Sequence, residues 1–116
     1  MKIYFNDDLP DTPAYNLASK NADAHYDLLF GLVKLRQSRG LTQKEVAKRL
    51  GISQQSVSEF EQMDANPSLS TITAYALAIG AELEFKVGQF SDYTDLVAEL
   101  WPSGEKSGTN GNLQTN

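Results

Sequence analysis

Two neighbouring glutamines, Gln54 and Gln55, carry the most specific side-chain chemistry in this sequence. A glutamine amide can donate and accept hydrogen bonds together, which bidentate contact with N6 and N7 of adenine requires. On a helical period of 3.6 residues, Ser58 and Glu59 also face out, while Val57 and Phe60 turn inward. We interpret this face as a reader of base edges. The alternative is a solvated polar face that binds nothing.

The residues before this face predict the scaffold that holds it. Thr42 and Glu45 have the spacing of a capping box and open an apolar helical stripe over residues 46–50. Gly51 follows that stripe, where a left-handed helix end favours glycine. Ser53 then caps a second helix. The pattern predicts a helix-turn-helix whose second helix is the reader.

The segment LTQKEVAKRLGISQQSVSEFE, residues 41–61, resembles the helix-turn-helix of the XRE, or lambda-repressor-like, family. The likeness continues through NPSLSTITAYALAIGAELEFKV, which is similar to the end of that domain in HigA- and HipB-type antitoxins. It covers roughly residues 28–87. The resemblance implies that Gln43 anchors to a phosphate and braces Gln54. It also implies that Gln54 and Gln55 contact bases, with Ser58 and Glu59 lining the groove.

Two features depart from the family pattern. The family commonly places glycine and then basic residues in the loop after the reading helix, whereas Met63 and Asp64 stand here. Fewer phosphate contacts and weaker DNA binding follow from that difference. About twenty additional residues also precede the expected start of the domain.

Charge is distributed unevenly along the chain, whose formal net charge is −5. Residues 34–62 carry six Lys and Arg against three Glu, whereas both flanks are acidic. This concentration of cations favours local contact with phosphates, for which we expect Arg36, Gln43, Lys44 and Ser53. The net negative charge of the whole chain is also compatible with binding to a basic protein partner.

The chain is expected to divide into four parts. Residues 1–20 are predicted to be an N-terminal arm with a short helix beginning at Thr12-Pro13. Residues 21–80 hold the DNA-binding domain. Its first helix runs from Asn21 or Asp23 to about Ser38, and its last helix is capped by Ser68.

Residues 81–101 are expected to serve dimerisation or partner contact. Leu83, Phe85 and Val87 alternate with charged residues and predict a short half-buried β-strand. A lone strand needs a partner, either residues 2–5 of the same chain or its own copy across a two-fold axis, which we favour. A short helix over 93–100 follows, ending at Trp101. Residues 102–116 are predicted to be a disordered tail.

Composition argues against other classes of function. The chain has no cysteine and one histidine, and we find no catalytic site, metal site or cofactor motif. His25 is interpreted as a surface or packing residue. No stretch approaches the roughly 20 apolar residues that span a bilayer, so a cytoplasmic protein without a membrane partner is expected.

The sequence therefore predicts an all-α, lambda-repressor-like domain of four to five helices with a short C-terminal β-strand. The expected function is sequence-specific binding of double-stranded DNA by a homodimer that represses transcription. The alternative is the antitoxin of a type II toxin–antitoxin pair, which binds a protein toxin and autoregulates its operon. An enzyme is not expected.

Overall fold

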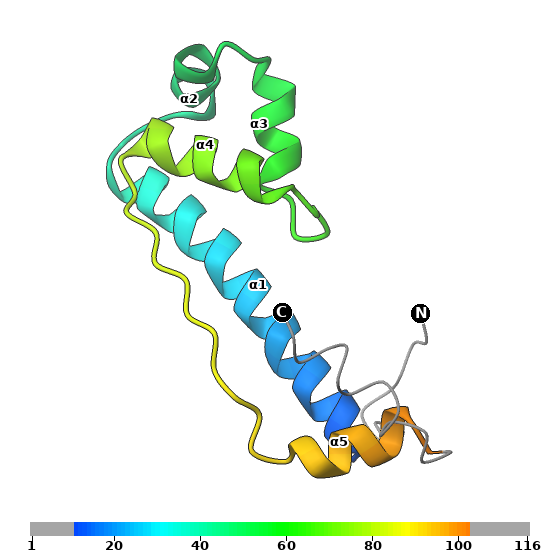
Figure 1. Ribbon diagram of the computed structural model, residues 1–116. Coiled ribbons are helices and arrows are strands. Elements are labelled where there is room, and N and C mark those ends of the chain that lie inside the picture. The colour runs from blue at the N-terminus through cyan, green and yellow to red at the C-terminus, as the bar shows by residue number, and fades with distance from the viewer. Residues whose placement is uncertain (1–10, 103–116) are drawn as a thin grey trace. The chain divides into compact units, whose positions relative to one another are not determined.

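A computed structural model describes residues 11–102, in which all regular structure is helical (Figure 1). The described helices are α1 Pro13–Ser38, α2 Gln43–Leu50, α3 Gln54–Phe60, α4 Leu69–Ile79 and α5 Tyr93–Leu100. The chain divides into two compact units, one comprising Asp23–Lys86 and the other comprising the segments on either side of it. The all-α prediction is thus confirmed for the described residues, and α2 and α3 form the expected helix-turn-helix.

Helix ends lie where the capping residues predict them. The Thr42 hydroxyl accepts from the Glu45 N–H at 3.0 Å, and the Thr42 N–H donates to Glu45 Oε1 at 2.8 Å, which completes the capping box. Gly51 ends α2 with φ 70°, and Gly80 ends α4 with φ 74°. Both values lie in the left-handed region, which glycine adopts without steric cost. Local side-chain chemistry therefore sets the length of α2 and the end of α4.

The core of the unit Asp23–Lys86 joins parts of four helices. Helix α2 packs against both α3 and α4, and the Phe60 ring of α3 stacks on Tyr75 of α4 with centroids 4.3 Å apart. The buried apolar residues are Leu29, Leu32, Val46, Ala47, Val57, Phe60, Ile72, Tyr75, Ala76, Ala78 and Ile79. Burial of these side chains supplies the main driving force for folding the unit.

Helix α1 differs from the prediction, because it runs unbroken from Pro13 to Ser38. The expected break at Asn21 or Asp23 is wrong. No proline or glycine stands there, so alanine-rich sequence carries the helix through both candidate caps. The predicted start is confirmed, since Thr12 Oγ1 accepts from the Tyr15 N–H at 3.2 Å. In the flanking unit, the Ala14 N–H also donates to Glu99 Oε1 of α5 at 2.8 Å.

The predicted C-terminal β-strand is wrong for the single chain, because residues 81–90 form no strand. Alternation of apolar and charged residues requires a paired neighbour before it produces a ladder. Leu83 packs on the core, whereas Phe85 is 57% exposed and Val87 is fully exposed. One proposed pairing partner, residues 2–5, lies outside the described residues, as does the predicted tail beyond residue 102.

Candidate nucleic-acid interface

Helix α3 presents the two adjacent amides to solvent. Ser53 caps the helix, its hydroxyl accepting from the Ser56 N–H at 3.0 Å. Val57 is 1% exposed and fixes the rotation of α3 about its axis, so that the side chains of Gln54 and Gln55 are exposed at its first turn. An N-terminal turn with exposed amides is what base readout by a recognition helix needs.

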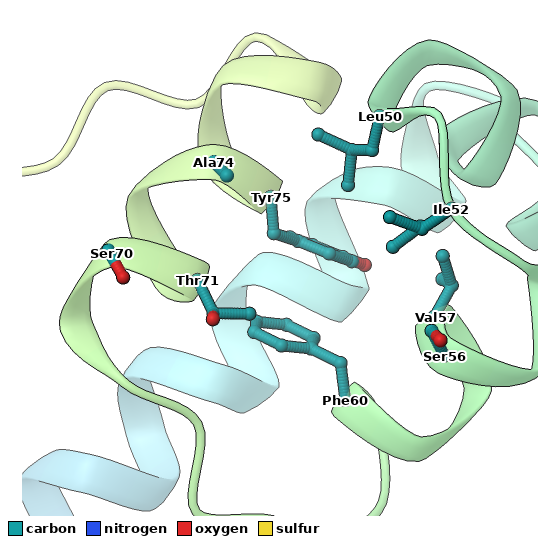
Figure 2. A pocket seen from close by; sticks show the side chains of 9 residues that line it. All are labelled: Leu50, Ile52, Ser56, Val57, Phe60, Ser70, Thr71, Ala74 and Tyr75. Atoms are coloured by element: carbon teal, nitrogen blue, oxygen red, sulfur yellow. The ribbon is translucent and has the colours of Figure 1, made fainter.

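The inner side of α3 is apolar. Figure 2 shows Phe60 extending from α3 toward α4, where the Tyr75 ring lies along it, and Val57 pointing toward Ile52. The hollow between these elements is lined by Leu50, Ile52, Ser56, Val57, Phe60, Ser70, Thr71, Ala74 and Tyr75. The two sides of α3 therefore differ in chemistry, with packing on one and hydrogen-bonding groups on the other.

Further along α3, Ser58 is half-buried and Glu59 is exposed. Glu59 Oε2 accepts from Gln55 Nε2 at 3.4 Å, a long hydrogen bond between side chains one helical turn apart. This contact occupies one N–H of Gln55 weakly, so the amide can exchange it for another partner.

Arg36 lies in the interior, away from its expected place at a phosphate. Arg36 is 8% exposed, and its guanidinium forms a bidentate ion pair with Glu61. Its Nε lies 2.6 Å from Oε2, and its Nη2 lies 2.9 Å from Oε1. Nη1 donates to the carbonyl oxygen of Leu41 at 2.7 Å. All three nitrogens of the guanidinium are therefore engaged within the protein.

Glu61 also accepts hydrogen bonds from Gln43 and Tyr75. Gln43 Nε2 donates to Oε1 at 2.9 Å, and the Tyr75 hydroxyl donates to Oε2 at 2.6 Å. Burial alone raises the pKa of Glu61, but hydrogen bonds from Arg36, Tyr75 and Gln43 outweigh it and hold that pKa below its ordinary value. Burial, followed by the bond to Glu61, raises the pKa of the Tyr75 hydroxyl. The carboxylate is charged, and Tyr75 keeps its proton.

Sequence reasoning missed this four-residue cluster, although it carried a signal. Arg36 follows Leu29 and Leu32 on the inward stripe of α1, where a cation requires a counter-charge. Tyr75 lies on the inward stripe of α4, where a buried hydroxyl needs a partner. The matching carboxylate, Glu61, lies directly after the buried Phe60.

Four further cations, Arg39, Lys44, Lys48 and Arg49, lie in or just before α2 and divide into two groups. Arg39 Nη1 donates to the Ile79 carbonyl at 3.0 Å and Arg49 Nη1 to the Ala78 carbonyl at 2.7 Å, so both stabilise the C-terminal end of α4. Lys44 and Lys48 are exposed one turn apart on α2. Unlike Arg49, these two lysines of α2 are directed to solvent.

Residues 11–102 include the single histidine of the sequence, His25. No group of three or more His, Cys, Asp or Glu side chains in this range is arranged to hold a metal ion. His25 Nε2 lies 3.5 Å from the Ala65 carbonyl oxygen, in a packing position. None of the described helices has the length and apolar character needed to cross a membrane.

Comparisons with known proteins agree with this geometry. Residues 32–86 match a family model described as helix-turn-helix. The chain is 36% identical over 80 residues to Antitoxin HigA1 of Mycobacterium tuberculosis, a match that covers 69% of this chain and 54% of that protein. Its sequence thus spans about half the length of this relative.

Two further relatives carry names of regulators. An uncharacterized HTH-type transcriptional regulator of Sinorhizobium fredii is 45% identical over 47 residues, covering 40% of this chain and 61% of that protein. The immunity repressor protein of Bacillus phage phi105 is 36% identical over 72 residues, covering 62% of this chain and 50% of that protein. No solved structure matches the chain with significance.

Proposed function

Because the chain belongs to the helix-turn-helix family through residues 32–86, we propose that it binds specific sequences in double-stranded DNA and represses transcription. The observation that carries this proposal is the exposed pair Gln54 and Gln55 on a helix whose rotation is fixed by the buried Val57. In the proposed complex, the first turn of α3 enters the major groove and the two amides contact base edges.

The remaining interface residues take supporting roles. Ser58 and Glu59 line the groove further along α3, with Glu59 placed to accept from a cytosine amino group. Gln43, Lys44 and Ser53 hold the sugar–phosphate backbone. Arg36 has no direct role at DNA in this proposal, since its guanidinium is bound to Glu61 and Leu41.

We also propose that two copies bind one operator. The DNA-binding domain of the proposal is residues 21–80, and residues 81–101 supply contacts between copies or with a partner. Phe85 and Val87 are exposed in the extended segment after α4, and burying them against a second copy would remove apolar surface from water. A two-fold dimer would present two reading helices to half-sites about 34 Å apart.

Selection of bound sequences from random duplexes tests the proposal. Wild-type protein should enrich a sequence with two related half-sites, and Gln54→Ala and Gln55→Ala should weaken the enrichment at specific positions within each half-site. Equal recovery of all duplexes by the wild type would refute sequence-specific binding.

A second function, neutralisation of a protein toxin, is favoured by the likeness to Antitoxin HigA1. In this proposal, the exposed aromatic residues Tyr93 and Trp101 contact the toxin, because aromatic side chains with acidic neighbours suit a basic partner. The test is co-expression with a small basic protein encoded beside this chain. Co-purification and relief of growth arrest would support it, and independent elution would contradict it.

A further inference from the structure

Four segments of the unit Asp23–Lys86 meet at the carboxylate of Glu61. Arg36 approaches from α1, Gln43 from the first turn of α2 and Tyr75 from α4, with donor–acceptor distances between 2.6 and 2.9 Å. The side chains of Arg36 and Glu61 are only 10% and 7% exposed, respectively. A hub with these distances and this burial holds its members in one arrangement.

The charge of Glu61 determines which way the Gln43 amide faces. An ionised carboxylate accepts hydrogen bonds and donates none, so Gln43 must turn its NH2 group, and not its carbonyl oxygen, toward Glu61. An exposed glutamine such as Gln54 has no such constraint and can present either end of its amide. The Gln43 amide is therefore oriented before any ligand arrives, by a bond of 2.9 Å to a buried carboxylate, whereas Gln55 meets the exposed Glu59 only at 3.4 Å.

We propose that Glu61 is a positioning residue for DNA recognition, which acts through Gln43 by leaving its second N–H and its carbonyl oxygen to face the duplex. This inference depends on the DNA binding proposed above. The free N–H is left to donate to a phosphate oxygen, and the carbonyl oxygen is left to accept from an amide. Arg36 and Tyr75 contribute by holding Glu61 in place.

A Gln43 amide that is already oriented in the free protein increases the affinity for DNA, because fewer side chains then become ordered on binding. A Gln43 amide released from Glu61 would have to select one orientation on binding and would lose one charge-assisted hydrogen bond. A net hydrogen bond of ordinary strength corresponds to roughly a three- to tenfold change in affinity. That range is the expected effect of disconnecting Gln43 from Glu61.

A double-mutant cycle with Gln43→Ala and Glu61→Gln tests the inference. Binding to the operator selected by the wild type is measured by fluorescence anisotropy, at a temperature where circular dichroism shows every variant folded. Glu61→Gln should weaken binding roughly three- to tenfold with Gln43 present and less than about twofold with Ala at position 43. Equal losses in both backgrounds would overturn the inference.

Two further variants separate positioning from general destabilisation. Tyr75→Phe keeps the ring stacked on Phe60 but removes one donor to Glu61, so it should weaken binding less than Glu61→Gln and only when Gln43 is present. Ile79→Val trims a core residue that makes no hydrogen bond to Glu61 through its side chain, and it should leave operator affinity unchanged. Loss of affinity in the Ile79 variant equal to that in Tyr75→Phe would contradict a positioning role.

Side-chain amide NMR provides a test without DNA. In the wild type, the two Nε2 protons of Gln43 should differ widely in chemical shift, and in Glu61→Gln they should approach those of the exposed Gln54. If the wild type prefers no duplex, both the proposed function and this inference fail. If it is selective but the cycle is additive and the Gln43 protons resemble those of Gln54, only the inference fails.

Discussion

Arg36 and Glu61 form a bidentate ion pair in the interior, with Nε–Oε2 and Nη2–Oε1 distances of 2.6 and 2.9 Å. The pair links α1 to Glu61, the residue that ends α3, and so connects these two helices. Removing one member of a buried pair leaves the other charge without compensation, which costs more than the pair itself contributes. The cluster at Glu61 therefore makes the orientation of α3 sensitive to single substitutions.

Arg36→Met is expected to lower the free energy of unfolding by about 3–5 kcal/mol, because Glu61 would remain buried and charged. Urea denaturation followed by circular dichroism measures the loss. Lys34→Met is the matched control on the exposed face of α1 and should change stability by only about 0.5 kcal/mol. A loss below about 1 kcal/mol for Arg36→Met would contradict the structural role of the pair.

The stability of the protein should decline in acid partly through Glu61. Its pKa in the folded state lies below the ordinary value, so the stabilisation is present above the unfolded pKa, near 4.3, and is lost as pH falls through the folded pKa. Urea denaturation between about pH 3 and pH 7 should show a flatter acid limb for Glu61→Gln than for the wild type. Parallel acid limbs in the two proteins would show that Glu61 does not contribute.

Hydrogen bonds from the Thr42 backbone and hydroxyl lower the pKa of Glu45 as well, which provides a control for the acid experiment. The Glu45→Gln protein should still show the loss of unfolding free energy at low pH that is due to Glu61, whereas Glu61→Gln should not.

The two helix-ending glycines should differ in their tolerance of alanine. Both have positive φ, and an L residue there costs about 1–2 kcal/mol. A Cβ on Gly51 would meet open space, whereas one on Gly80 would lie 2.5 Å from Nη1 of Arg39. We expect Gly80→Ala to destabilise the protein more than Gly51→Ala in thermal unfolding, and the difference to vanish when Arg39 is also alanine. If Gly80→Ala remained more destabilising than Gly51→Ala by the same amount in the Arg39→Ala protein, the contact with Arg39 would be excluded as the cause.

Lys44 and Arg49 should separate DNA contact from stability, although each substitution removes one positive charge. Lys44 is exposed, so Lys44→Ala should weaken binding to operator and random DNA alike. The slope of log affinity against log salt concentration should become shallower by about one for each protomer bound. Arg49 is bound to the Ala78 carbonyl, so Arg49→Ala should mainly lower the melting temperature. Anisotropy titrations over a range of salt concentrations check both, and an equal change of slope in the two variants would contradict the assignment.

The parts of the fold that the sequence predicts are those determined by neighbouring residues. Thr42 with Glu45, Ser53 before α3, and Gly80 after α4 each act within one turn of a helix, so their patterns are readable without the fold. The same holds for the exposure of Gln54 and Gln55, because the helical period turns Val57 and Phe60 inward and leaves both glutamines facing out.

The parts that sequence reasoning missed depend on distant residues. Arg36 and Glu61 are 25 residues apart, and nothing local shows that they meet, so Arg36 was expected at a phosphate. Residues 81–87 predict a strand because apolar and charged residues alternate along them, but this alternation does not supply a strand to pair with. The break in α1 was expected because Asn21 and Asp23 often cap helices, although they lie inside one here.

The central claim, that the amides of α3 read bases, is tested most directly by the ratio of operator affinity to random-duplex affinity for Gln54→Ala. If Gln54 makes a bidentate base contact, operator binding should weaken by about 1–3 kcal/mol while random-duplex binding is unchanged, so the ratio falls. Equal weakening on both duplexes, which would leave the ratio at its wild-type value, would contradict the claim.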